Sequence, residues 1–190
     1  MSWLPGTNIP TWSIKVSQHS CSDWWKAPTD CTQYFTGETG TLKTYNYDSG
    51  VHLANQDYNI CIRTERKMCT IYYAQTGPAT FKMSGTISGS GNIQSSWCSE
   101  DYITIPGGQN PALPISPGPT ATRINRFCGG MLQHTLVGTT AVTIYTVITP
   151  FRIGVVTDGG ESDSYSSPPA TYAQSLSTGF QIHYKQLNCA

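Results

Sequence analysis

Short runs of alternating apolar and polar residues recur along most of this chain. At positions 180–184, Phe180, Ile182 and Tyr184 are separated by single polar residues, so in a strand all three face one way. No long segment carries apolar residues at helical spacing, so little helix is expected. The pattern predicts an all-β chain with strands at 41–47, 58–65, 68–75, 80–87, 97–106, 141–149, 150–158 and 179–187.

Segments rich in Gly, Ser or Pro interrupt these runs at 84–96, 107–119 and 159–177. Proline cannot donate a hydrogen bond to a sheet, so these segments are predicted loops. Their length makes them candidate binding loops, although tolerated insertions would have the same composition. A charged turn at 64–68 predicts a hairpin between the strands on either side. Residues 1–30 show no sustained period and are predicted to form an irregular N-terminal arm before a single domain at 31–190.

The charge balance excludes some partners. Lys and Arg total 11, and Asp and Glu total 11, so the formal net charge is zero. Such a chain lacks the basic surface that drives binding to nucleic acid. No apolar run approaches the roughly 20 residues that span a bilayer. We therefore expect neither a nucleic-acid partner nor a membrane span.

Cysteine usage points to an oxidising compartment. The chain has 7 cysteines, and two pairs, Cys31/Cys61 and Cys98/Cys128, are each 30 positions apart. We therefore expect a secreted, extracellular protein. Because the number is odd, at least one cysteine is free, bonded to another chain, or bonded to a residue outside this sequence. The first residues lack the basic and apolar regions of a signal peptide, which suggests a mature fragment or a piece of a longer secreted chain.

Five motifs in order resemble the CUB domain family. They are the runs at 37–47 and 52–63, the Cys-Ser-Glu-Asp-Tyr strand at 98–105, the Arg-Phe-Cys-Gly turn at 126–129, and the closing strands at 150–158 and 179–184. The sequences at 33–37 and 52–56 most resemble those of the secreted CUB-like proteins of arthropods. The resemblance covers about residues 30–189. It implies a jelly-roll-like sandwich of two antiparallel sheets.

The resemblance also implies which cysteines pair. It gives the disulfides Cys31–Cys61 and Cys98–Cys128. In the CUB topology the last strand lies antiparallel to the strand that starts near Met68, which brings together the remaining pair, Cys69 and Cys189. Cys21 is then left over.

Many CUB domains hold calcium with one Glu and two Asp at one end of the sandwich, and this chain matches part of that set. Asp101 and Asp158 occupy the two aspartate positions, whereas residues 93–96 (Ile-Gln-Ser-Ser) stand where the glutamate is expected. Calcium takes six to eight oxygen ligands, so the implied site is incomplete. The alternative is that the two carboxylates only accept hydrogen bonds from loop amides.

The arm offers a candidate partner surface at Cys21, Trp24 and Trp25. Adjacent tryptophans in an extended chain point in opposite directions, so one of them is expected to meet a partner or the arm itself. Tryptophan is common at interface hot spots. Alternatively, both cover an open end of the sandwich. Cys21 would link chains, reach a cysteine outside this sequence, or be buried as a free thiol.

No catalytic motif is present. Gly-x-Ser-x-Gly and phosphate-binding glycine motifs are absent, and the four histidines, His19, His52, His134 and His183, are too scattered to suggest a zinc site. We therefore expect a secreted, non-enzymatic CUB-like module that recognises protein or glycan through its end loops and arm, with no cofactor unless calcium binds. The alternatives are a self-associating structural subunit of an extracellular assembly, and an accessory domain of a longer secreted protein.

Overall fold

The computed structural model describes residues 13–23, 25–49, 52–78, 80–83, 91–93, 98, 100–109, 124–133, 140–159 and 177–189. Its strands are β1 (Cys31–Phe35), β2 (Thr39–Lys43), β3 (Asp57–Ile62), β4 (Met68–Gln75), β5 (Phe81–Lys82), β6 (Gly91–Ile93), β7 (Tyr102–Gly108), β8 (Ile124–Gly129), β9 (Ile144–Thr146), β10 (Phe151–Val156) and β11 (Gly179–Asn188). A single turn of 3₁₀ helix, η1 (Tyr47–Ser49), follows β2.

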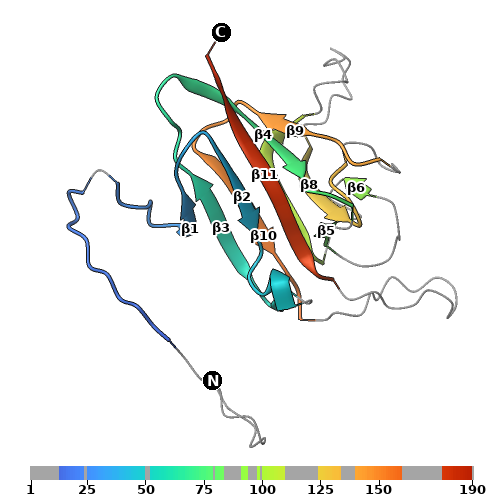
Figure 1. The fold of residues 1–190 in the computed structure, drawn as a ribbon. Helices are drawn as coiled ribbons and strands as arrows, with labels where there is room; N and C mark the ends of the chain where they lie inside the picture. The colour runs from blue at the N-terminus through green and yellow to red at the C-terminus, as the bar shows by residue number, and fades with distance from the viewer. Residues whose placement is uncertain are drawn as a thin grey trace, which may run out of the picture.

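The strands form two sheets packed face to face (Figure 1). One sheet has six strands in the order β1-β3-β10-β7-β8-β6, and the other contains β2-β11-β4-β9, with β5 paired to β11. The all-β sandwich expected from the sequence is confirmed. One pair departs from the expected antiparallel arrangement, because β1 runs parallel to β3. The chain reaches β3 from β1 only after crossing to the other sheet as β2, and this detour returns it in the same direction.

The strand predictions hold best where alternation is strongest. The run at 68–75 is β4 with the predicted limits, and the run at 179–187 is β11, extended by one residue. Phe180, Ile182 and Tyr184 of β11 are all buried, as their alternation predicts, whereas His183 is exposed.

The hairpin predicted at 64–68 is wrong. A tight turn does form there, with the Met68 N–H donating to the Glu65 carbonyl at 3.0 Å and Lys67 at φ 67°. However, β3 and β4 lie in different sheets, so the turn carries the chain across the sandwich. Turn residues indicate a reversal of direction, but they do not say which sheet the next strand joins.

Three strands were not predicted. β1 lies where the arm meets the domain, β8 was not recognised, and β6 lies inside the loop expected at 84–96. β6 is three residues long and pairs with β8 in the register Asn92↔Cys128 and Ile93↔Phe127. Such a strand depends on a partner that is distant in sequence, so local alternation cannot reveal it.

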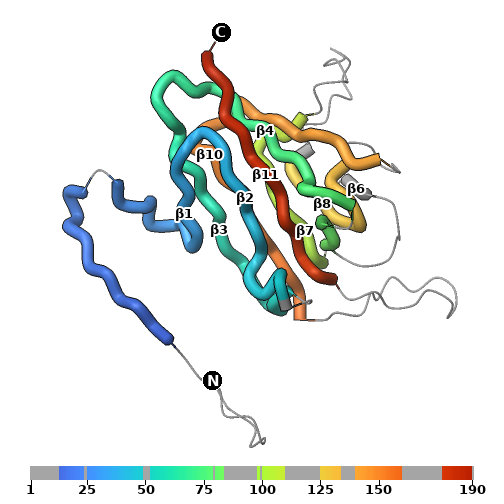
Figure 2. The backbone as a smooth tube through the Cα atoms, in the orientation of Figure 1, coloured from blue at the N-terminus to red at the C-terminus, as the bar shows by residue number. Residues whose placement is uncertain are grey.

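The core lies between the sheets. The six-stranded sheet contributes residues such as Ile60, Phe127 and Ile153, and the facing sheet contributes Leu42 and Ile182, each with none of its surface exposed. Figure 2 shows β2 and β11 passing in front of β3 and β10. The start of β11 lies at the bottom of Figures 1 and 2, the C-terminus lies at the top, and the arm leaves the sandwich beside β1.

Candidate functional site

The two aspartates singled out from the sequence lie together at one end of the sandwich. Asp101 immediately precedes β7, and Asp158 follows β10 two positions after its end. β7 and β10 are antiparallel neighbours, and the register Val156↔Tyr102 brings the end of one beside the start of the other. The Asp158 backbone N–H donates to Asp101 Oδ1 at 3.0 Å.

A third residue, His52, completes this arrangement. His52 Nε2 lies 3.2 Å from Asp101 Oδ2, and the two residues retain only 4% and 3% of their surface exposure. His52 Nδ1 lies 3.1 Å from the Leu53 carbonyl oxygen. The carboxylate and the carbonyl both accept hydrogen bonds, so the ring makes both contacts at once when it carries two protons. No local pattern in the sequence indicates this pairing, because His52 and Asp101 are 49 positions apart.

Backbone hydrogen bonds around the pair join the bases of several connecting segments. The His52 backbone N–H donates to the Ser177 carbonyl at 3.1 Å, immediately before β11. The Asn55 N–H donates to the Asp158 carbonyl at 2.6 Å, and the Thr157 N–H donates to the Gln56 carbonyl at 2.8 Å. We call this end, defined by His52, Asp101, Asp158 and Ser177, the clamped end.

The described contacts of Asp101 do not by themselves make up a calcium shell. Calcium prefers a shell of six to eight oxygens. Here one Asp101 oxygen faces an imidazole nitrogen, and the other accepts an amide N–H. Within the described parts of the chain, no group of three His, Cys, Asp or Glu residues could hold a metal ion. Calcium binding at Asp101 and Asp158 therefore stays a prediction that needs its own measurement.

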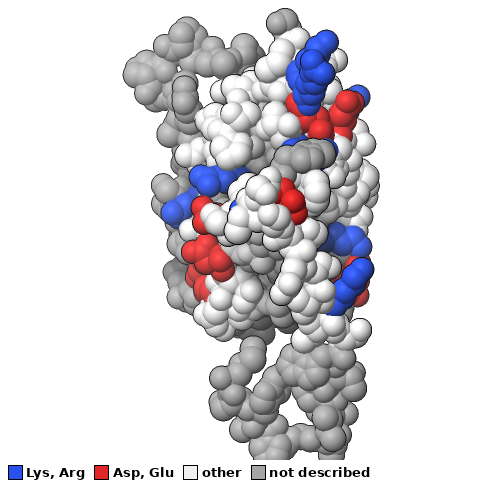
Figure 3. All heavy atoms as spheres, turned by 90° about the vertical axis from the view of Figure 1, so that its left-hand side faces the viewer, with Lys and Arg blue, Asp and Glu red and all other residues white. Residues whose placement is uncertain are grey.

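Exposed apolar side chains lie close to the clamp. Leu53, next to His52, has 44% of its surface exposed, and Tyr45, just after β2, has 38%. The Tyr45 ring packs against the Tyr58 ring at 5.1 Å between centroids, and burial raises the pKa of Tyr58 to about 12. This packing orients the Tyr45 ring at the surface. Charges of both signs lie scattered over the face seen in Figure 3, without an extended patch of either sign.

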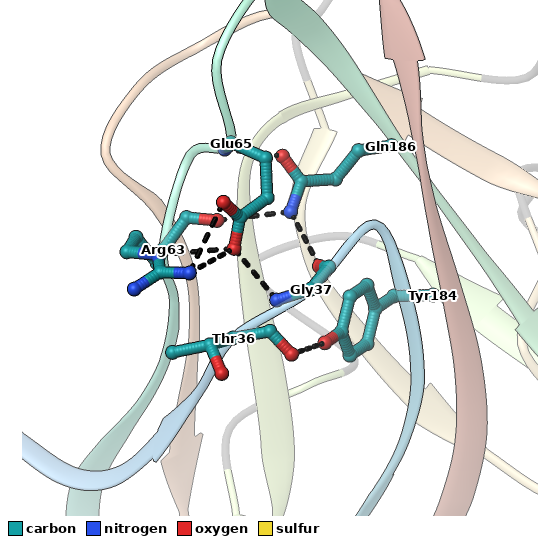
Figure 4. Close-up of polar contacts among 6 residues, drawn as sticks. All are labelled: Thr36, Gly37, Arg63, Glu65, Tyr184 and Gln186. Atoms are coloured by element: carbon teal, nitrogen blue, oxygen red, sulfur yellow. Dashed lines mark hydrogen bonds and ion pairs between the residues drawn. The ribbon is translucent and has the colours of Figure 1, made fainter.

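A second polar network lies at the opposite end and is shown in Figure 4. Glu65 accepts the Gly37 N–H at 2.6 Å and the Arg63 Nε–H at 3.0 Å. The Gly37 hydrogen bond, followed by the Arg63 hydrogen bonds, lowers the pKa of Glu65. The buried Gln186 side chain accepts the Glu65 N–H and donates to the Gly37 and Arg63 carbonyls.

This network is a structural junction. It joins the β1–β2 turn, the crossover between β3 and β4, and the last strand, and Tyr184 adds a hydrogen bond to the Thr36 carbonyl at 3.3 Å. Burial, and to a smaller extent the Glu65 carboxylate, raise the pKa of Tyr184. Because these side chains bond mainly to backbone groups of the fold, we assign them to stability rather than to recognition.

The arm carries the candidate partner residues. Cys21 is exposed, and it is the one cysteine outside a disulfide in the part of the chain that the structure describes. It lies in a turn closed by the Asp23 N–H donating to the Ser20 carbonyl at 3.1 Å and by the Ser20 N–H donating to Asp23 Oδ2 at 2.9 Å. Trp25 has 47% of its surface exposed. Trp24 lies outside the described residues.

Three disulfides fasten the sandwich. They join Cys31 to Cys61, Cys98 to Cys128, and Cys69 to Cys189, which are the pairs that the resemblance implies. The first lies within the β1–β3 pair, and the third joins the start of β4 to the residue after β11. Three disulfides fit a protein of an oxidising compartment.

Comparison with known proteins agrees with this architecture. The family model described as the animal CUB domain matches residues 28–187. This chain belongs to the animal CUB domain family. CUB domains of this family are typically extracellular accessory modules of larger proteins, and they are in general non-catalytic and mediate protein interactions.

Solved structures show remote likeness to this CUB domain. The CUB1-EGF-CUB2 domains of rat MASP-1 share 13% identity over 83% of this chain and 43% of that one, with a TM-score of 0.46. The extracellular region of zebrafish Gpr126/Adgrg6 shares 16% identity over 85% of this chain and 15% of that one, with a TM-score of 0.45. The MASP-1 CUB2 domain bound to Ca²⁺ shares 15% identity over 82% of this chain and 98% of that one, with a TM-score of 0.38.

This CUB domain spans less than half of the first two structures. No curated protein matches the chain. In the described ranges, no helix is long and apolar enough to cross a membrane.

Proposed function

We propose that this CUB domain is a secreted, non-enzymatic module that recognises an extracellular protein or glycan through the clamped end. The observation that carries the proposal is the buried His52–Asp101 pair, with 2% and 4% of the side-chain surfaces exposed. A buried polar pair that is hydrogen-bonded contributes modest net stability, but it holds its neighbours in one arrangement. Here those neighbours are the bases of the connecting segments at 52–56, 157–158 and 177.

The surface beside the clamp suits recognition. Leu53 and Tyr45 present apolar and aromatic surface beside the hydrogen-bonded segments of the clamped end. Rigid aromatic residues bind both protein and sugar surfaces at little entropic cost, because few rotatable bonds must be ordered. The neutral net charge favours a partner bound by shape and hydrogen bonding over one attracted from a distance.

Affinity capture with matched variants tests the proposal. The oxidised wild-type chain, a Tyr45→Asp/Leu53→Asp variant and a Val147→Asp control are used to capture secreted proteins and to probe a glycan array. Val147 is 61% exposed and follows β9 at the opposite end from the clamp. We expect a ligand that binds the wild type and the control and loses most of its affinity for the double variant. A ligand that binds all three chains equally contradicts the proposed site, and turnover of a substrate contradicts the non-enzymatic assignment.

A second candidate is a structural subunit of an extracellular assembly, such as a matrix, fibre or coat, that self-associates through the arm. Exposure of Ile14, Val16, Trp25 and Cys21 on residues before the first strand favours it. In this proposal the arm at 1–30 is a linking segment, and 31–190 is the folded domain. The remaining alternative, an accessory domain of a longer secreted protein, is compatible with either role.

Two narrower proposals rest on sequence alone. We propose that this chain is related to secreted arthropod CUB-like proteins, because of its sequence at 33–37 and 52–56. A family tree that includes arthropod and vertebrate CUB domains tests this placement. We also propose Cys21, Trp24 and Trp25 as partner-binding residues of the arm, to be tested by substituting each in the capture experiment.

A further inference from the structure

The described part of the arm has the alternating sequence of a β-strand but is not paired with either sheet. At 13–17, polar residues alternate with Ile14 and Val16, which are 78% and 79% exposed. β-Branched residues at alternating positions are typical of strands that bury one face. Among the described residues, no backbone hydrogen bond joins 13–19 to the sandwich, and the first backbone hydrogen bond of the arm is in the turn at Ser20. The arm therefore carries a strand pattern, with its apolar face uncovered.

The chain also offers an open sheet edge with partly covered apolar surface. β1 is the outermost strand of the six-stranded sheet, with β3 as its neighbour on one side. The Arg63 N–H donates to the Phe35 carbonyl at 2.9 Å, so the peptide groups of Phe35 point toward β3. Because these groups alternate along a strand, the N–H and carbonyl of Tyr34 point toward the open edge. Phe35 packs against the core but is only partly buried.

We propose that the arm of one copy of this chain adds as a strand to the β1 edge of a second copy, with Ile14 and Val16 covering Phe35. An open edge strand readily accepts another strand, and exchange of an identical segment is a common route to dimers. The occupant is a second copy because this chain carries both an exposed apolar face at 14–16 and a β1 edge, and among the described residues no backbone hydrogen bond joins the two. This inference deepens the second candidate function, self-association through the arm, and it rests on that function.

Sedimentation velocity over a concentration series tests the exchange. The oxidised chain of residues 1–190 carries Cys21→Ser, so that a disulfide between chains cannot produce the dimer. We expect a dimer that dissociates on dilution. Ile14→Asp/Val16→Asp places two charges on the face to be buried and should raise the dissociation constant by at least about 100-fold. Ser13→Asp/Ser17→Asp adds the same charge to the same segment on its other face and should leave most of the dimer intact.

Mixing two variants tests separately the arm, which donates the strand, and the β1 edge, which accepts it. Tyr34→Pro removes the N–H that points to the open edge and should abolish acceptance of a strand. The Ile14→Asp/Val16→Asp chain retains an intact β1 edge, and the Tyr34→Pro chain retains an intact arm. Each alone should be monomeric, and their mixture should form a heterodimer through one exchanged arm. Failure of the mixture to associate, with both chains folded, overturns the proposal.

Hydrogen exchange provides a readout that does not depend on the proline variant. We expect the amides of 14–16 and of Tyr34 to become protected as the concentration of the chain rises. Protection that does not change with concentration in a monomer means that the arm docks on its own sheet, which overturns the exchange. A dimer unaffected by Ile14→Asp/Val16→Asp overturns the exchange but preserves self-association, and a monomer at every concentration overturns both.

Discussion

At the scale of single residues, the main feature is the contact between His52 and Asp101. The carboxylate takes one hydrogen bond from the ring and one from the Asp158 amide, and it is almost completely buried. Removing one partner of such a pair costs more than the pair contributes, because the other is left buried without its hydrogen bond. The aspartate therefore contributes to the stability of this end of the domain through these two hydrogen bonds.

Asp101→Ala should lower the free energy of unfolding by about 2–4 kcal/mol, because it removes the carboxylate that the buried His52 ring and the Asp158 amide contact. We expect the same loss in calcium and in EDTA, measured by thermal and urea unfolding of the oxidised chain. Asp57→Ala, which removes an exposed carboxylate at the start of β3, serves as the control and should have little effect. If calcium raises the melting temperature of the wild type and not of Asp101→Ala, the metal does reach this carboxylate.

The sequence revealed part of this site. Asp101 and Asp158 stood out because each matches a position in a family motif, and the structure places them side by side. His52 did not stand out, because its partner is 49 positions away and no metal-binding or catalytic spacing links them. Such a contact depends on the strand order within the six-stranded sheet, where β10 lies between β3 and β7, and a single sequence does not record that order.

At the scale of the elements, the crossover at 63–67 decides the topology. It leaves one sheet at the end of β3 and enters the other at β4. Glu65 and Gln186 hold it at the β1–β2 turn and at β11 through the hydrogen bonds of Figure 4. The sequence predicted a turn here from its charged residues. That the turn crosses between the sheets depends on contacts with distant residues such as Gln186, which no local pattern in the sequence indicates.

Glu65→Gln should make the folding stability depend less on pH in the acidic range. The pKa of Glu65 in the folded chain is lowered from 4.5, first by the Gly37 N–H and then by Arg63. A group with a lowered folded pKa contributes stability that is present above its unfolded pKa and is lost as the pH falls through the folded pKa. The wild type should therefore lose more stability below about pH 4.5 than the variant, as measured by melting temperature against pH.

Glu38→Gln is the matched control, because Glu38 lies in the same β1–β2 turn with an exposed side chain. It should leave the pH dependence in the acidic range as in the wild type. The same pH dependence for the wild type and Glu65→Gln would mean that other carboxylates account for the acid sensitivity. The Glu65 side chain is partly exposed, with 20% of its surface accessible, so screening by water and salt should keep the difference modest.

At the scale of the whole molecule, the disulfides close loops of very different length. Cys31–Cys61 and Cys98–Cys128 each span 30 positions, whereas Cys69–Cys189 spans 120 and ties the last strand to β4. Equal spacing made the first two conspicuous in the sequence. The third depended on the family topology, because nothing local relates position 69 to position 189.

The double variant Cys69→Ser/Cys189→Ser should lose more stability than Cys31→Ser/Cys61→Ser. In the chain-entropy model, closing the longer loop restricts the unfolded chain more, by about 1 kcal/mol for this ratio of lengths. Urea unfolding of both variants, with a native near-ultraviolet spectrum required of each, measures the difference. A greater loss in the Cys31→Ser/Cys61→Ser variant would show that native packing around β1 outweighs loop entropy.

The clamped end also bears on how such domains diverge. Asp158 and Ser177 flank a stretch whose two attachment points are held by Asp101 and by the His52 backbone. Insertions, deletions and substitutions between those two residues leave the anchors in place, so selection can alter that stretch without first rebuilding the sandwich. Related chains in this lineage should therefore vary most in length between these two positions and least at the buried pair.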